Sequence, residues 1–174
     1  MNDPAQIQWA FQIFLLLIGG ALTILGGFLA TVIKLRLENK QEIKCIKISL
    51  VDEVSELSKI IGRMLETQKT SKNLHKNYLD EILENMESFD GYKNRSFLIG
   101  DKTTRDDLRQ FYKKLIIETK NSLNSSVVGT LNEDDIQQTA KVSAVVTSFT
   151  TIGTEAKNLI TTIESYKYKA FWIL

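Results

Sequence analysis

Hydrophobic residues follow two different patterns along this chain. Over residues 9–33 they occupy every face of a predicted helix, and none of these 25 positions has a charge. At about 1.5 Å per residue, such a helix exceeds the roughly 30 Å hydrocarbon core of a bilayer. From Ile43 onward, apolar residues recur at intervals of three and four, which is typical of amphipathic helices. The sequence predicts a transmembrane helix over 9–33 and a helical domain over 34–174.

The second pattern predicts four helices. The first continues the membrane segment without a break and extends to about Gln68, because no Pro or Gly intervenes before Gly62. The second ends at the Asp90-Gly91 pair. The expected buried stripes of these two helices are Ile43, Ile46, Leu50, Val54, Leu57, Ile61 and Met64, and then Leu74, Tyr78, Ile82, Met86 and Phe89.

The third helix is expected to begin at Thr104, which forms a capping pattern with Asp107, and to end near Leu123. The fourth is expected to begin at Asn132 and to run for about 40 residues. Its stripe would be Val145, Phe149, Ile152, Ala156, Leu159, Ile163, Tyr166 and Ala170. A strand is the alternative for its Thr- and Val-rich middle. Short connections make successive helices antiparallel, so the predicted fold is all-α, an antiparallel bundle continuous with the membrane helix.

Flanking charge predicts the orientation of the membrane helix. Only Asp3 precedes it, whereas Lys34, Arg36 and further lysines follow it. Because cationic flanks stay cytoplasmic, residues 1–8 would lie outside the cell and residues 34–174 inside it. Trp9 is expected at the outer interface, with Lys34 and Arg36 reaching the inner one.

The segment "YKYKAFWIL" contains aromatic rings alternating with lysines. This composition suits the headgroup zone of a bilayer. If the fourth helix runs back toward the membrane, Lys167, Lys169 and Trp172 would lie at the interface.

Two alternatives to a membrane span remain for residues 9–33. One is a buried helix of a soluble protein, although apolar residues on every face argue against it. The other is a cleavable signal peptide. The run is longer than a typical signal-peptide core and has no basic segment before it.

One face of the predicted membrane helix differs from the rest. Polar and small residues gather within about 90° of its circumference: Gln12, Leu16, Gly19, Thr23, Gly26 and Ala30. Gly19, Thr23 and Gly27 also follow the small-xxx-small spacing that lets membrane helices approach closely. The sequence therefore predicts a homo-oligomer built through this face, either a dimer or a ring around a pore. The alternative is that glycine is simply common in membrane helices.

Composition offers little for other chemistry. Residues 34–174 contain 22 basic and 20 acidic residues, without the basic bias typical of nucleic-acid binding. One His and one Cys are too few for a zinc site, and no Gly-rich phosphate loop is visible. We expect His75 to be solvated, Cys45 to be a small packing residue and the carboxylates of "DEVSE" to be exposed. No enzyme activity, metal or cofactor is predicted.

The arrangement of "WAFQIFLLLIGGALTILGGFLATVIKLRL" followed by helices from "LENKQEIKCIKISL" to "YKYKAFWIL" resembles the membrane accessory protein of RNA-targeting type VI-B CRISPR systems. The resemblance implies a divergent HEPN-like helical domain, a ring-shaped membrane pore, and antiviral defence alongside an RNA-guided nuclease. HEPN ribonucleases need an Arg a few residues before a His. Arg63 is twelve residues before His75, which argues against RNA cleavage. A membrane-tethered adaptor for a cytoplasmic partner is the other hypothesis.

Overall fold

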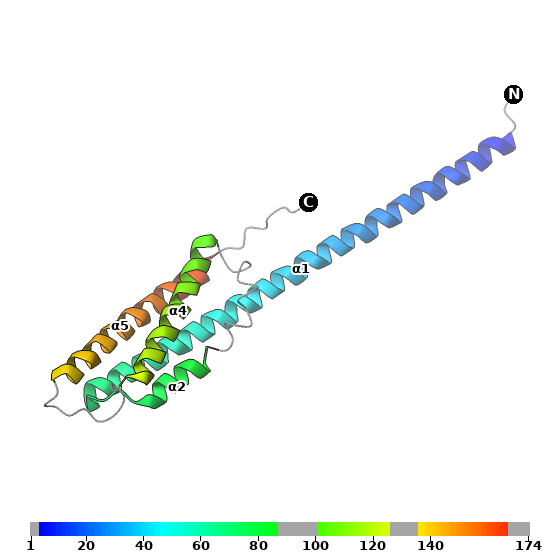
Figure 1. The fold of residues 1–174 in the computed structure, drawn as a ribbon. Coiled ribbons are helices and arrows are strands. Elements are labelled where there is room, and N and C mark those ends of the chain that lie inside the picture. Colours follow the sequence, from blue (N-terminus) through cyan, green and yellow to red (C-terminus); the bar gives the residue numbers. More distant parts are fainter. Residues whose placement is uncertain (1–3, 87–100, 126–135, 167–174) are drawn as a thin grey trace. The chain divides into compact units, whose positions relative to one another are not determined.

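The described part of the chain is all-helical in a computed structural model. It covers residues 4–86, 101–125 and 136–166, within which there are four helices and no strand. These are α1 (Pro4–Ser71), α2 (Lys76–Glu84), α4 (Lys102–Asn124) and α5 (Ile136–Ser165). Figure 1 labels these helices. Residues 1–42 and 43–174 form two compact units.

The helix boundaries differ from the prediction at four places. α1 reaches Ser71, where Lys72 takes a left-handed conformation (φ 56°) and donates its N–H to Gln68 O at 2.8 Å, a common helix ending. α2 ends at Glu84, with Asn85 as its C-cap, and not at the Asp90-Gly91 pair.

The other two differences concern the later helices. α4 begins earlier than expected, because Asp101 rather than Thr104 is its N-cap: Asp101 Oδ1 accepts from Thr104 N at 2.9 Å. α5 ends at Ser165, so Tyr166 is not helical and the predicted end of this helix was wrong.

The middle of α5 is helical throughout, which rules out the strand alternative. Seven of its Ser and Thr hydroxyls, from Thr147 to Ser165, donate to backbone carbonyls three or four residues earlier. This bonding satisfies the hydroxyls without a partner outside the helix. The expected start at Asn132 and the stripe residues Phe89 and Ala170 lie outside the described residues.

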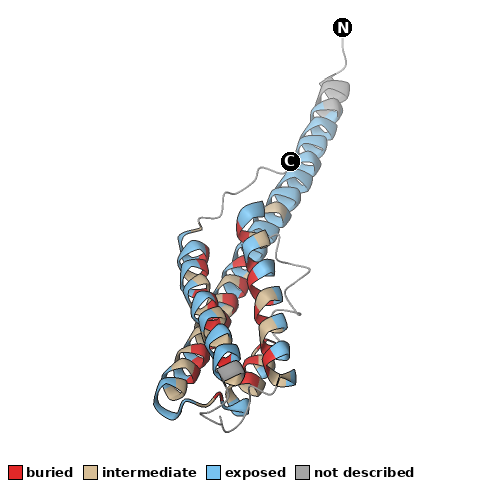
Figure 2. Cartoon of the chain, turned by 60° about the vertical axis from the view of Figure 1, so that its left-hand side comes forward, coloured by how far each residue is buried: buried red, intermediate tan, exposed pale blue. Residues whose placement is uncertain are grey.

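The core of the second unit follows the predicted stripes. Every expected stripe residue of α1 is buried, from Ile43 at 7% exposed to Leu57 at 0%. All of them but Ile43 form one cluster with residues of α2, α4 and α5 and with Leu74 and Met86, which flank α2. The members from these three helices are Leu79 and Ile82; Leu108, Phe111, Tyr112 and Leu115; Val142, Phe149, Ile152, Ala156, Leu159 and Ile163. In Figure 2 the buried positions lie on the sides of these helices that face one another. Spacing by three and four therefore identified most of the core, although Tyr78 and Val145 are only half-buried.

Two contacts fix the direction of α5 along the second half of α1. Lys47 Nζ reaches Glu164 O at 2.7 Å, near the end of α5. Fourteen residues further along α1, Ile61 Cγ2 would lie 3.5 Å from a Cβ at Gly153, near the middle of α5. Residue numbers along α1 therefore increase while those of the contacted residues of α5 decrease, which means that these two segments run in opposite directions.

Candidate helix-association site in the apolar segment

No described part of the chain covers the apolar segment of α1. Between Trp9 and Ile33, no described side chain is buried and only Val32 is half-buried. Large apolar residues are widely exposed, with Leu16 at 77%, Ile24 at 74% and Trp9 at 67%. The structure therefore gives no support to the buried-helix alternative. By length and composition, the described residues contain one helix able to cross a membrane, located near the N-terminus.

No described part of the chain approaches the glycines of this segment closely. A Cβ added at Gly19, Gly20, Gly26 or Gly27 would meet nothing within 4 Å. All four lie within a helix, where glycine costs roughly 0.5–1 kcal/mol relative to alanine. Neither a turn nor a close approach within the chain explains them.

Two threonines continue the small-residue stripe with their hydroxyls already satisfied. Thr23 Oγ1 donates to Gly19 O at 2.8 Å, and Thr31 Oγ1 donates to Gly27 O at 2.9 Å. Each bond spans four residues, so it joins successive members of the stripe. A threonine bonded in this way adds no unpaired donor in a bilayer, where an unsatisfied polar group is costly.

The remaining predicted face residues lie on the same helix. Gln12, Leu16, Gly26 and Ala30 are helical and exposed, as are Gly19 and Thr23. At 100° per residue they share a sector of about 90°. The opposite side includes Phe14, Ala21, Leu25 and Phe28, so the face with small residues is distinct from the bulky one.

Charged residues begin immediately after the apolar run. Lys34 Nζ lies 3.8 Å from Glu38 Oε1, but the lysine side chain remains 73% exposed. Such an exposed pair contributes at most about 1 kcal/mol and leaves Lys34 able to reach a membrane surface. Arg36 is exposed and, at the other end, so is Trp9. Lys167, Lys169 and Trp172 lie outside the described residues.

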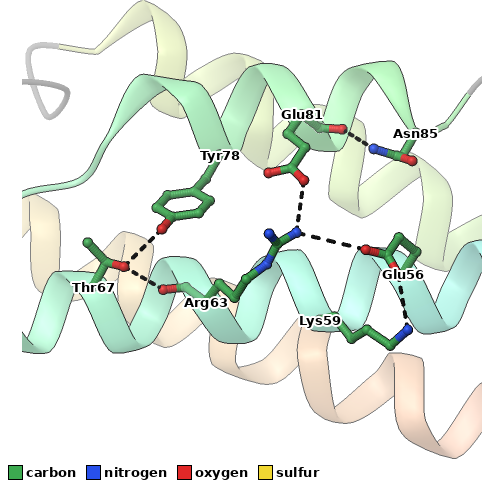
Figure 3. A network of polar contacts seen from close by, with 7 residues as sticks. All are labelled: Glu56, Lys59, Arg63, Thr67, Tyr78, Glu81 and Asn85. Atoms are coloured by element: carbon green, nitrogen blue, oxygen red, sulfur yellow. Dashed lines mark hydrogen bonds and ion pairs between the residues drawn. The ribbon is translucent and has the colours of Figure 1, made fainter.

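The residues of a HEPN-type nuclease are not brought together. Arg63 bonds Glu81 Oε1 at 2.8 Å and lies 3.8 Å from Glu56 Oε1, forming a polar network that joins α1 to α2 (Figure 3). His75 is exposed, as expected, with its Nε2 at 3.4 Å from Ser71 Oγ. Arg63 therefore connects two helices, and no arginine–histidine pair is formed by these two residues.

A groove lies between α4 and α5 in the second unit. Lys114 Nζ and Glu155 Oε1 approach to 2.6 Å across it, with both side chains about 40% exposed. The other lining residues are Asp107, Gln110, Phe111, Asn158, Leu159 and Thr162. The ion pair ties the two helices together, and no histidine or cysteine lies among the lining residues to suggest catalysis.

Two predictions about single side chains were wrong. Glu53, within "DEVSE", is buried at 8% exposed and accepts a hydrogen bond from Tyr112 Oη at 2.7 Å. Glu53 lies three residues after Leu50 and four before Leu57, so its spacing was the signal that it belongs to the core side of α1. Cys45 is exposed and does not pack in the core, because its neighbours one turn away are on the solvent side of α1.

Comparison of this chain with protein-family models, with curated proteins and with solved structures finds no match.

Proposed function

We propose that this chain is a single-pass membrane protein whose copies assemble through the small-residue face of helix 9–33 and line a pore. Residues 1–8 would lie outside a bacterial cytoplasmic membrane, and residues 34–174 would form an antiparallel helical bundle in the cytoplasm. The observation that best supports assembly is that a Cβ added at any of the four glycines would meet nothing within 4 Å in the described part of the chain. Between membrane helices, the same glycines would allow close backbone contact.

The exposed apolar surface supports the membrane location. Exposure of apolar side chains such as Leu16 and Ile24 to water is unfavourable in free energy. Lipid would remove these side chains from water without a protein partner. The lysines and arginine that follow Ile33, with none before Trp9, support an inside location for the bundle.

Polarity on the assembling face favours a ring over a closed pair. Exposing the polar Gln12 side chain to acyl chains is energetically unfavourable. In a lumen, the same side chain could bind water or a polar partner. With helix axes about 9 Å apart, eight helices would leave a lumen of roughly 6–7 Å radius, lined by Gln12, Gly19, Thr23 and Gly26. Leu16 would be an apolar constriction in such a lumen. The family resemblance adds a setting, antiviral defence with an RNA-guided nuclease.

The first test compares two full-length variants that add leucine side chains on opposite sides of the helix. Gly19→Leu with Gly27→Leu fills the small-residue face, whereas Ala21→Leu adds a leucine on the bulky face. We expect the double variant to weaken assembly about tenfold or more, equivalent to about 1.4 kcal/mol, and Ala21→Leu to leave it unchanged. Light scattering of the detergent-solubilised protein over a range of concentrations measures the mass.

The same proteins in dye-loaded vesicles test the pore. Wild type and Ala21→Leu should release a small dye such as carboxyfluorescein, and the double glycine variant should not. A wild-type protein that stays monomeric at every concentration would contradict assembly. Assembly without dye release would contradict the pore and favour the membrane-tethered adaptor. His75 forms no pair with Arg63, so His75→Ala should change neither the mass measured by light scattering nor the release of dye.

A further inference from the structure

Lys34 is the first charged residue after the apolar run, and it lies on the same side of α1 as the small-residue face. At 100° per residue it is about 40° from Ala30, in the middle of that face, and it follows Leu16 by about five complete turns. Residues 9–42 have no acidic residue within the sector of about 90° that this face occupies. The face therefore ends in a cation, whose side chain is 73% exposed.

The other charges that follow the apolar run lie farther from the middle of the face. Glu38 is about 80° to one side of it and Lys40 about 80° to the other, whereas Arg36 and Glu42 are about 120° away. In a ring of parallel helices, one flank of each helix meets the opposite flank of the next helix. Glu38 of one copy would then lie beside Lys40 of its neighbour, where the two charges offset each other.

The ion pair within one copy does not cancel the charge of Lys34. Its Nζ lies 3.8 Å from Glu38 Oε1, and both side chains are more than half exposed. Exposed pairs of this kind are weak, because water solvates both groups. The proposed lumen has a radius of roughly 6–7 Å, which is shorter than the Debye length of about 8 Å at physiological salt. Every Lys34 of the ring would therefore act on an ion that passes its mouth.

We propose that Lys34 of each copy forms a cationic ring at the inner mouth of the pore and makes the pore selective for small inorganic anions such as chloride. Rings of lysine or arginine favour anions in channels, because they attract the anion and repel cations. Gln12 and Thr23, farther along the lumen, have no charge, so Lys34 sets the preference. This inference rests on the proposed pore and names what passes through it.

Two single substitutions test the ring, because each removes one positive charge from a different side of α1. Lys34→Gln removes it from the face, and Arg36→Gln removes it about 160° away. The full-length proteins are reconstituted in planar bilayers of uncharged phosphatidylcholine, and reversal potentials are measured in a gradient of potassium chloride. We expect wild type and Arg36→Gln to pass chloride at least about threefold better than potassium. Lys34→Gln should lower that ratio to about one, and Lys34→Glu should favour potassium.

The outcomes separate failure of the ring from failure of the pore. A wild-type channel that conducts but does not prefer chloride overturns the ring and leaves the pore standing. Equal loss of the preference in Lys34→Gln and Arg36→Gln also overturns the ring, because the charge of the whole surface then suffices. A lower mass of Lys34→Gln in light scattering would place Lys34 in a contact between copies, against a position at the mouth. A wild-type protein that assembles but conducts no ion overturns the pore, and the ring with it.

Discussion

A hydrogen bond between Tyr112 and Glu53 lies inside the otherwise apolar core of the bundle. Tyr112 is 1% exposed, and its hydroxyl donates to Glu53 Oε1 at 2.7 Å. Burial, the neighbouring negative carboxylate and the hydrogen bond to it, in that order, raise the pKa of the Tyr112 hydroxyl above its ordinary value near 10. The neutral phenol is thus strongly preferred in the folded protein.

Tyr112→Phe should destabilise the bundle by about 1–3 kcal/mol at pH 7, because it removes a donor from a buried carboxylate. Urea unfolding of the full-length protein in detergent measures the loss. Tyr78→Phe is the matched control, since the Tyr78 hydroxyl is half-buried and lies 3.0 Å from Thr67 Oγ1, where water can replace it. Equal losses in the two variants would contradict a special cost at Glu53.

The same variant also has a pH signature. Above about pH 10 the unfolded chain releases the Tyr112 proton, while the folded protein retains it because its pKa is raised. The unfolded state then binds fewer protons, so stability falls as pH rises, by up to about 1.4 kcal/mol per unit. Wild type should lose stability between pH 9.5 and 11 more steeply than Tyr112→Phe, and parallel profiles would overturn this account.

Single side chains were the hardest feature to predict from the sequence. A carboxylate and a thiol were assigned by residue type, which gave a solvated Glu53 and a packed Cys45, whereas the structure has the reverse. Their positions relative to the apolar stripe of α1 would have given the right answer. What the sequence could not provide is the partner, because Tyr112 is 59 residues away from Glu53.

At the scale of elements, periodic patterns predicted the helices well and their ends less well. The stripe from Ile43 to Met64 is buried because a three–four repeat keeps one side of a helix facing the core. The start of α4 was misplaced because two capping patterns overlap, one from Asp101 to Thr104 and one from Thr104 to Asp107. The structure uses the first, which leaves Thr104 inside the helix and buried.

The end of α5 depends on a contact between helices, and Lys47→Met tests it. Methionine keeps an apolar stem but removes the ammonium that bonds Glu164 O and Tyr166 O. We expect the last turn of α5 to fray, at a cost of about 0.3–1 kcal/mol, and amides 162–166 to exchange hydrogen about 2–5-fold faster. Lys44→Met, which alters an exposed lysine of the same helix, should leave that exchange unchanged; equal acceleration would contradict the contact.

At the scale of the whole chain, the two units differ in where they place their apolar side chains. The second unit buries its apolar residues in its own core, whereas residues 9–33 leave theirs exposed. The sequence contains the same contrast, because an uncharged run and an amphipathic repeat differ plainly. It could not predict a subunit number, because small residues permit close approach of helices without specifying how many helices meet.

Cys45 permits a direct measurement of orientation, since it is the one cysteine of the chain and it is exposed. If residues 34–174 are cytoplasmic, a membrane-impermeant maleimide should leave Cys45 unlabelled in intact spheroplasts and label it in inverted vesicles. Asn2→Cys in a Cys45→Ser background should show the opposite pattern, because residue 2 would lie outside. At least tenfold differences in labelling are expected, since the bilayer excludes the reagent. Labelling of Cys45 in sealed spheroplasts would reverse the proposed topology and, with it, the assignment of Lys34 and Arg36 to the inner surface.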